Sequence, residues 1–366
     1  MDPLSQGVVG AVCAQSVAGK RTRIAGVAGA LGGMLADLDV LIRSSEDPLL
    51  AIEYHRHFTH ALVFIPVGGL IASLLLWLPF RNKLRFRMLY LFSTLGYATA
   101  GLLDACTSYG TQLLWPFADN RIAWNVISII DPLFTFPLVI LAAAAFYKKT
   151  GCPARIAVVF LTGYLLFGTW QRDRAEAAAL NLAQSRNHPV ERITVKPSIF
   201  NLVVWRSIYE SNGRYHIDAL RVLPFRNPRY FAGASIPVLQ AESLQDRLPA
   251  GSTLSDDIAR FAHFSDHYLA LHPDHENVIG DVRYSMLPNG LEPLWGIEID
   301  LREPDSHAFF KTFREPDKAS AQMRQLWDMI RGRGAEGVEG DGYLVDRSLK
   351  MEDGYLGDER WRIGFD

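Results

Sequence analysis

Acidic and histidine side chains occur at four places inside or beside apolar segments of residues 1–131. They are Asp37 with Asp39, the histidines of residues 55–60, Asp104, and Asp131. Charged side chains are costly in an apolar membrane segment and usually serve a function there. Carboxylates combined with imidazoles suit Zn, Mn or Fe, whereas oxygen ligands alone suit Mg. If the fold brings these side chains together, they predict a divalent-metal site, with Zn or Mn favoured.

The apolar segments that position these residues predict a polytopic α-helical membrane domain of about six helices over residues 1–170. An apolar stretch of about 18 or more residues is typical of a spanning helix. Residues 61–80 contain no charged side chain, and residues 154–170 contain only Arg155. The expected helices are Leu4–Ala18, Ile24–Ile42, Ala61–Leu78, Met88–Thr107, Ala123–Tyr147 and Ala154–Trp170. The second helix has small residues at every fourth position, which lets helix backbones approach closely in lipid: Ala25, Gly29 and Gly33.

The basic residues predict the orientation of this domain. They gather in three loops that six spans would place on one face: Lys20, Arg21, Arg23, Arg81, Lys83, Arg85, Arg87, Lys148, Lys149 and Arg155. Cytoplasmic loops are enriched in Lys and Arg, so that face is expected to be cytoplasmic. Residues 43–60 and 107–122, and everything after Trp170, then lie on the opposite side. All four ionisable groups fall on that non-cytoplasmic face at a similar membrane depth, which favours a shared metal site.

The second half of the chain, after Trp170, predicts a water-soluble region. Residues 171–190 are expected to form a helical stalk, because Arg172–Arg186 is rich in Ala, Leu and charge, and residues 191–366 a small α+β domain. Asn212-Gly213 is a strong hairpin signal between strands expected at Leu202–Glu210 and Arg214–Val222. Two further strands and two helices are expected: Val282–Met286, Leu294–Leu301, Leu254–Leu271 and Ala319–Ile330. The tail after Arg331 is expected to be flexible, although Trp361 and Phe365 are able to dock.

Composition argues against several classes of protein. The net charge of −2 and the lack of a basic face argue against a nucleic-acid partner. Three cysteines, all in the membrane half, provide no disulfide framework: Cys13, Cys106 and Cys152. No basic segment precedes the first apolar run, so a cleaved signal peptide is not expected. Membrane lipids are the expected partners, with a lipid-like small molecule as candidate substrate; no protein partner is indicated.

Several short motifs occur in a characteristic order along the membrane half. They are Met-Asp-Pro-Leu-Ser-Gln-Gly at residues 1–7, Asp37-Leu-Asp39, His55-Arg-x-x-Thr59-His60, Leu-Asp104, the run 108–116 that ends in Trp-Pro, and Ile130-Asp-Pro132. Residues 1–170 thereby resemble the membrane-bound metal-dependent hydrolase family, described as LexA-binding, inner-membrane-associated hydrolases. The stretch Pro197-Ser-Ile-Phe-Asn-Leu-Val-Val-Trp205 resembles the start of a C-terminal soluble domain in longer relatives. The resemblance implies a divalent-metal hydrolase comparable to zinc phospholipases, without implying a particular substrate.

The sequence departs from the family pattern at several positions. Ala36 replaces a Pro before the Asp-x-Asp pair, His57 replaces a Gly, and Ala61 replaces a Ser. Gln6 stands where a His is common near the N-terminus. Ala100 stands where many members have a His four residues before the Asp of the fourth helix. Either His57 substitutes for that His, or fewer protein ligands bind the metal, or the site has lost its activity.

The preferred interpretation is a metal-dependent hydrolase of the bacterial inner membrane. Its active site would lie at the non-cytoplasmic face and act on lipid or lipid-linked esters or phosphoesters. The expected metal ligands are Asp37, Asp39, His55, His60 and Asp104. The expected catalytic residues are Asp131 as a general base, Arg56 and Arg121. The alternative is a non-catalytic, membrane-anchored binding protein; a transporter is least favoured, because the acids cluster at one face and none marks the midplane.

Structural roles compete with each functional one. Asp37 and Asp39 can cap a helix end exposed to water, and His55 and His60 can hydrogen-bond lipid headgroups from an interfacial loop. The other candidates have structural alternatives of the same kind: Asp104 bonded to Thr107 or Ser108, Asp131 as a helix cap, and Arg121 paired with Asp119.

Overall fold

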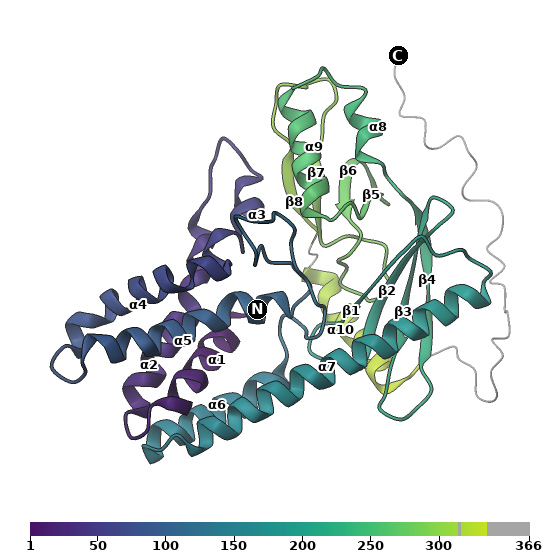
Figure 1. Cartoon of the computed structure of the whole chain (residues 1–366). Coiled ribbons are helices and arrows are strands. Elements are labelled where there is room, and N and C mark those ends of the chain that lie inside the picture. The colour runs from purple at the N-terminus through teal and green to yellow at the C-terminus, as the bar shows by residue number, and fades with distance from the viewer. Residues whose placement is uncertain (314–315, 335–366) are drawn as a thin grey trace.

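The chain folds into an N-terminal helical region and a C-terminal region of two antiparallel sheets (Figure 1). The computed structural model describes residues 1–313 and 316–334. Nearly all of the tail predicted to be flexible, including Trp361 and Phe365, lies outside these residues. One long helix, α7 (Cys152–Ser185), runs from the helical region to the first sheet and connects the two regions.

The helical region contains six further α-helices, joined by loops and short 3₁₀ segments. The α-helices are α1 (Pro3–Val17), α2 (Thr22–Leu35), α3 (Leu50–Tyr54), α4 (Ile65–Phe80), α5 (Phe86–Ala105) and α6 (Pro132–Lys148). The 3₁₀ segments are η1 (Ala36–Leu41), η2 (Phe58–His60) and η3 (Leu62–Phe64). Four of the six predicted membrane helices start within two residues of the observed ones, because apolar runs end at clear charged or Pro-containing boundaries.

Within residues 1–313 and 316–334, three segments are long and apolar enough to cross a membrane: Thr22–Leu41, Leu62–Phe80 and Cys152–Ser185. The predicted count of about six spans is therefore not supported. Helices α1 and α6 have only 15 and 17 residues, which is short for a bilayer core. Helix α5 has 20 residues but is less apolar, because it carries Arg87 and Asp104 among several polar side chains.

The predicted start of the fifth membrane helix at Ala123 is wrong. Helix α6 begins at Pro132, with Asp131 as its N-cap accepting hydrogen bonds from the backbone of Leu133 and Phe134. Proline suits the first helical position, since it has no backbone N–H to satisfy. The preceding residues form an extended loop, in which Ile122 pairs with Thr111. This loop lies beside the ionisable residues instead of extending a helix.

Glycines let three of these helices cross at close range. A Cβ atom on Gly29 of α2 would lie 2.2 Å from the carbonyl oxygen of Gly10 on α1. A Cβ atom on Gly96 of α5 would lie 2.0 Å from the carbonyl oxygen of Gly29. The close approach predicted from the small residues of the second helix is confirmed, and it holds the ends of α1, α2 and α5 together.

The basic loops meet at one end of the helical region. Arg23 donates to the carbonyl of Phe146 at the end of α6 (3.1 Å), and Arg155 at the start of α7 donates to the carbonyl of Ser16 (3.1 Å). Arg21 shares a depression with residues 81–86. The ionisable residues singled out above occupy the opposite end of the helices.

The C-terminal region contains two four-stranded antiparallel sheets with strand orders β1-β2-β3-β4 and β5-β6-β7-β8. The strands are β1 (Arg192–Pro197), β2 (Val204–Ser211), β3 (Arg214–Arg221), β4 (Arg229–Pro237), β5 (Leu269–His272), β6 (His275–Asp281), β7 (Trp295–Glu298) and β8 (Phe309–Thr312). The helices are α8 (Ala241–Gln245), α9 (Thr253–Phe264) and α10 (Pro316–Arg331).

The hairpin predicted at Asn212-Gly213 is confirmed, because Ser211 pairs with Arg214 and both turn residues have positive φ angles. Helix α9 ends at Phe264, earlier than predicted, since Asp266 and His267 adopt left-handed backbone conformations and start the turn into β5. The strand predicted at 282–286 is also wrong, because β6 ends at Asp281.

The two regions pack directly against each other instead of being separated by a stalk. The last three turns of α7 bury Ala175, Ala179 and Leu182 against Trp205 and Leu220 of the first sheet. Elsewhere the loops of residues 43–60 and 107–122 contact the C-terminal region. These loops and the C-terminal region therefore lie at the same end of the helices.

Candidate metal centre

The close crossing of α1, α2 and α5 brings four polar side chains together. Asp37 lies in η1, where α2 tightens into a 3₁₀ helix, and Asp104 lies in the last turn of α5. Gln6 reaches in from the second turn of α1, and His60 ends η2. The segments come from positions 6 to 104 of the chain, so only the tertiary fold assembles this group.

His60 lies at the centre of the group. Its Nε2 atom is 3.0 Å from an Oδ atom of Asp104 and 3.3 Å from one of Asp37. One ligand atom from each of these three residues lies within 4.8 Å of the others, a spacing that suits a single metal ion. His60 and Asp104 are buried, whereas the Asp37 side chain is 18% exposed, so the group is accessible from the Asp37 side.

Asp39 supports this group from behind. One of its carboxylate oxygens lies 3.1 Å from His60 Nδ1, and the other lies 2.9 Å from His55 Nδ1. It also accepts hydrogen bonds from the Thr59 hydroxyl (2.9 Å) and the Arg56 backbone N–H (2.8 Å). A carboxylate on the far nitrogen of a histidine is the usual means of orienting a metal ligand. Asp39 and His55 therefore form a second layer around Asp37, His60 and Asp104. The three acids Asp37, Asp39 and Asp104 are called the acidic cluster below.

Positive and neutral donors compensate the buried carboxylate of Asp104. The Arg56 guanidinium lies 3.2 Å from it and also donates to the Thr107 hydroxyl (2.9 Å). The amino group of Met1 donates to the same carboxylate. Gln6 Nε2 donates to Asp104 (2.9 Å) and Asp37 (3.2 Å), which links the two acids. Asp104 is thus anchored by Met1, by Gln6 of α1 and by Arg56 of the loop before η2.

His60 lies two residues before the apolar segment that begins at Leu62. Burial alone would lower the pKa of His60, but its hydrogen bonds to the acidic cluster raise that pKa to about 10. Without a metal ion the ring therefore holds a proton on each nitrogen. A divalent ion on Nε2 would replace one of these protons, since metal ligands bind in their deprotonated form.

The residues present fit a divalent metal ion. Asp37, His60 and Asp104 supply two carboxylates and one imidazole, a mixed set that Zn and Mn accept. Gln6 Oε1 is buried without a hydrogen-bond partner in the described part of the chain. Rotating the Gln6 amide would turn this oxygen toward the two acids as a fourth ligand. The position of the missing family histidine, Ala100, is a buried contact of Tyr97 in the nearby apolar packing.

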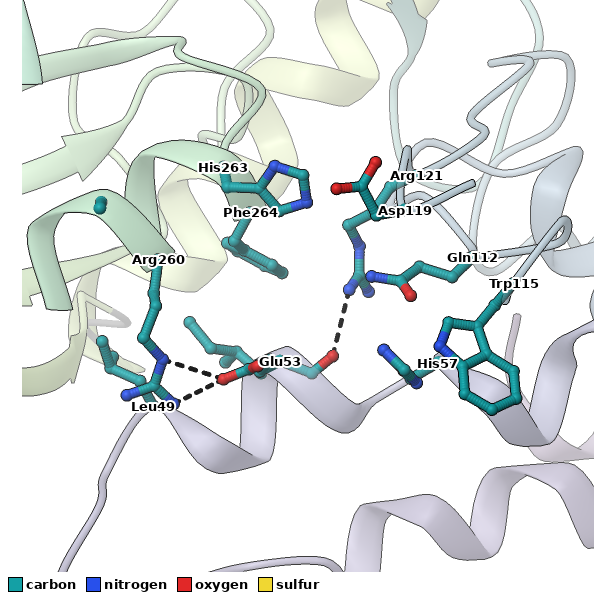
Figure 2. Close-up of a pocket in the computed structure, with 12 residues that line it drawn as sticks. Leu49, Glu53, His57, Gln112, Trp115, Asp119, Arg121, Arg260, His263 and Phe264 are labelled. Carbon is teal, nitrogen blue, oxygen red and sulfur yellow. Dashed lines mark hydrogen bonds and ion pairs between the residues drawn. The ribbon is translucent and has the colours of Figure 1, made fainter. Parts of the chain in front are cut away.

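Two of the predicted catalytic residues, Asp131 and Arg121, lie outside this group. Asp131 caps α6 and accepts a hydrogen bond from the Tyr164 hydroxyl (2.7 Å). The helix cap is the structural role that the sequence offered for it as an alternative. Arg121 donates to the carbonyl oxygens of His55 (2.6 Å) and Glu53 (3.4 Å) and so holds the loop that carries His55. Figure 2 shows the hydrogen bond between Arg121 and the backbone carbonyl of Glu53. Neither Asp131 nor Arg121 contacts the acidic cluster, so their roles there would be indirect.

His57 faces a different pocket, of about 400 Å³, between the loops and α9 (Figure 2). Its ring lies 5.6 Å from that of Trp115, and its Nδ1 atom is buried without a partner. Burial and then the charge of Arg121 lower the pKa of His57 below its ordinary value. His57 therefore does not take the place of the missing family histidine in the arrangement described.

A second group with metal-ligand spacing joins the two regions: Asp47, Asp257 and His307. The Arg260 guanidinium lies within 3.0 Å of both acids and also contacts Glu53. Because this cation already compensates the carboxylates, the group forms an ion-pair network that holds α9 on the loop of α3. Asp47 precedes Asp257 and His307 by more than 200 residues in the chain, so no sequence spacing could reveal the group.

Sequence reasoning named Gln6 and Thr107 without giving them a function. Gln6 was noted only as a departure from a family histidine, and Thr107 only as a partner for Asp104. The sequence does contain a signal for Gln6, because a polar amide inside an apolar helix usually has a polar partner and so indicates a functional or structural contact.

Comparisons with known proteins concern mainly the helical region. Residues 1–175 match the YdjM inner membrane protein family. The chain is 32% identical over 152 residues to the inner membrane protein YbcI of Escherichia coli, a match that covers 40% of this chain and 83% of YbcI. It is 29% identical over 135 residues to the uncharacterized protein YfhP of Bacillus subtilis, covering 37% of this chain and 39% of the length of YfhP. No solved structure matches the chain.

Proposed function

Because this chain belongs to the YdjM inner membrane protein family, we propose that it is a metal-dependent hydrolase of the inner membrane. The observation that carries the proposal is the position of His60. Its Nδ1 atom faces Asp39, while its Nε2 atom faces both Asp37 and Asp104 at 3.0–3.3 Å. Asp37, His60 and Asp104 are the proposed ligands of one divalent ion, with Zn or Mn favoured.

The bound ion would supply Lewis acidity toward a scissile bond and lower the pKa of a water molecule. The chain's own residues prepare the site for this chemistry. Asp39 holds the His60 ring so that Nε2 faces Asp37 and Asp104, and Arg56 fixes the carboxylate of Asp104. Such positioning reduces the reorganisation required during the reaction.

His55 is the proposed proton acceptor at Nε2. Its Nδ1 atom is bonded to Asp39 at 2.9 Å, and its side chain is 26% exposed. An imidazole held at one nitrogen by a carboxylate presents the other nitrogen for proton transfer. In this arrangement one carboxylate, Asp39, orients both a metal ligand and a base. His55 thereby takes the role of general base that was predicted for Asp131, because Asp131 caps α6 and is bonded to Tyr164.

A lipid or lipid-linked ester or phosphoester is the proposed substrate. The accessible side of the site is at Asp37, and its neighbours Leu38 and Leu41 are 53% and 74% exposed. Exposed leucines next to an apolar spanning segment contact lipid, so a substrate approaching Asp37 would come from the bilayer. A scissile group at the level of the headgroups would then reach the ion.

The site and the C-terminal region are proposed to lie on the non-cytoplasmic side, opposite the basic loops. Fusing reporters after Asp366 tests this orientation in cells. A reporter that is active only outside the cytoplasm should be active there. An inactive one, together with an active cytoplasmic reporter, would reverse the orientation without affecting the metal site.

The hydrolase proposal is tested on the full chain in detergent, loaded with Zn or Mn and assayed with short-chain phospholipids and a chromogenic phosphodiester. Hydrolysis should require metal and should be lost in His60→Ala, while Asp173→Asn, an exposed change on α7, should retain it. No hydrolysis of any of these substrates by the metal-loaded protein would count against the enzyme and favour a membrane-anchored binding protein.

A further inference from the structure

A second cavity, of about 450 Å³, lies between the loop of residues 110–125 and the C-terminal region. Arg121 and His263, labelled in Figure 2 beside the first pocket, also line this cavity. Its other walls include Arg192 and Lys196 of β1 and Arg283, which follows β6. The cavity is therefore lined by four basic side chains that come from both regions of the protein.

Lys196 is the most unusual of these side chains. It is only 5% exposed, and its Nζ atom has one long hydrogen bond, to the carbonyl oxygen of Ser108 at 3.4 Å. The ring of Tyr284 lies 4.2 Å from Nζ. Among the described residues no carboxylate lies within 4.0 Å of it, so no ion pair compensates its charge. Burial of a charge without a partner is costly.

The acids near the cavity already have partners. Asp281 is paired with Arg283 at 2.7 Å, and Asp266 with Arg192 at 2.7 Å. Within the described part of the chain, the Arg121 guanidinium donates hydrogen bonds only to backbone carbonyl oxygens and lies over the rings of Tyr109 and Phe264. Its Nε atom is buried without a hydrogen-bond partner. Two positive side chains, Lys196 and Arg121, are thus left without a carboxylate on the walls of one cavity.

We propose that this cavity binds an anionic group of the phosphate type, with Lys196 and Arg121 as its recognising cations. An oxyanion between them would supply the missing counter-charge and accept charge-assisted hydrogen bonds. Asn125 Oδ1, which is also buried without a partner on the cavity wall, can accept a hydrogen bond from a hydroxyl of the ligand. A phosphomonoester with a hydroxyl-bearing organic part matches both features.

The electrostatics of Lys196 agree with this assignment. Burial, and then repulsion by Arg283, hold the pKa of Lys196 well below its usual range. An anion beside Nζ would favour the charged form and raise that pKa again. An apolar side chain would fill the same space without the free-energy cost of burying a charge. Packing alone therefore does not explain a lysine at this position.

A lipid headgroup and a soluble phosphate compound both offer this chemistry, and the test distinguishes the two sources. The full chain in detergent is titrated with inorganic phosphate, glycerol 3-phosphate and dioctanoyl phosphatidic acid, and the unfolding midpoint is followed. Saturable stabilisation by at least one of them is expected. Binding of the lipid alone would identify a headgroup, and binding of the soluble phosphates as well would identify a soluble ligand.

Matched variants locate the site. Lys196→Met should weaken binding by more than about tenfold, because it removes a charge-assisted hydrogen bond. Lys311→Met, the same change at a half-exposed lysine paired with Glu298, should not alter it. Ala123→Leu adds bulk to the cavity wall without changing charge and should also weaken binding. The midpoint of each variant without ligand shows that it is folded.

The proposal fails if none of the three compounds stabilises the wild type. It also fails if folded Lys196→Met and Ala123→Leu bind as tightly as the wild type. Asp37→Asn separates this site from the metal centre, because it should abolish hydrolysis and leave phosphate binding intact. Loss of phosphate binding in Asp37→Asn would place the anion at the metal centre and overturn the assignment.

Discussion

The acidic cluster at the ends of α2 and α5 and the basic cavity beside β1 compensate their buried charges in different ways. In the acidic cluster every carboxylate has partners: His60 bridges all three, and Arg56 contacts Asp104. In the basic cavity Lys196 has no ion pair with any residue that the structure describes, and its one hydrogen bond is to a backbone carbonyl. The first site is held together by its own side chains, whereas in the second Lys196 and Arg121 have no carboxylate partner and are proposed to receive their counter-charge from a ligand. Removing a charged side chain should therefore lower the free energy of unfolding at the first site and raise it at the second.

The largest effect is expected from Asp104→Ala. It leaves the Arg56 guanidinium buried without its carboxylate, and breaking one partner of a buried pair costs about 3–5 kcal/mol. Unfolding in detergent, followed by circular dichroism, measures this loss. The control is Asp173→Ala, whose exposed pair with Arg172 should change stability by less than about 1 kcal/mol. Equal effects of the two changes would show that the acidic cluster is not a connected network.

The opposite sign is expected for Lys196→Met. Replacing an uncompensated buried charge with an apolar side chain of similar length should stabilise the ligand-free protein by about 1–4 kcal/mol. The same unfolding measurement applies, with Lys311→Met as the matched surface change. A large fall in stability for Lys196→Met would mean that its contacts with Tyr284 and Ser108 are structural, and the contrast between the two sites would disappear.

Asp39→Asn should weaken the metal centre without abolishing it. An amide retains the contact with His60 Nδ1 but lacks the charge, and second-layer changes typically lower metal affinity by about 10–100-fold. Competition with a chromogenic chelator measures this affinity. The matched change is Asp131→Asn, at another buried acid that only caps α6 and contacts Tyr164. A similar loss in both variants would contradict the separate role assigned to Asp39.

The smallest effect concerns His216, remote from both sites. Burial, then the charges of His188 and Arg186, lower the pKa of His216 to about 4, whereas an unfolded histidine titrates near 6.5. As the pH falls, His216 is therefore protonated in the unfolded chain before it is protonated in the folded protein. The folded state loses the corresponding stability between about pH 6.5 and pH 4, and retains it above about pH 6.5. His216→Phe should flatten the unfolding midpoint across this window. An unchanged slope would show that His216 does not contribute.

The sequence could predict the acidic cluster because its members end or begin apolar segments. Alternating helices place Asp37, His60 and Asp104 at one end of the helical region without any knowledge of the contacts. The sequence could not separate Asp37 from Asp39, because their directions depend on the tightening of α2 into η1. It also extended the fifth helix to Ala123, since an apolar loop and an apolar helix have similar compositions.

The basic cavity was beyond prediction from the sequence. Lys196 lies on a strand, where a lysine is usually solvated, and its burial depends on Ser108, 88 positions earlier in the chain. Arg121 was predicted as a catalytic residue, yet its basic neighbours in the cavity come from β1 and from the loop after β6. Hairpin signals such as Asn212-Gly213 are local and were predicted correctly. The packing of the C-terminal region on the membrane loops joins residues that are far apart in the sequence, and no sequence pattern predicted it.

The most direct test of the central claim is the metal content of the purified full chain, measured by mass spectrometry beside His60→Ala and Asp37→Asn. The account predicts close to one Zn or Mn ion per wild-type chain and little or none in either variant. A wild-type protein that holds no divalent metal after reconstitution, or variants that hold as much as the wild type, would contradict it.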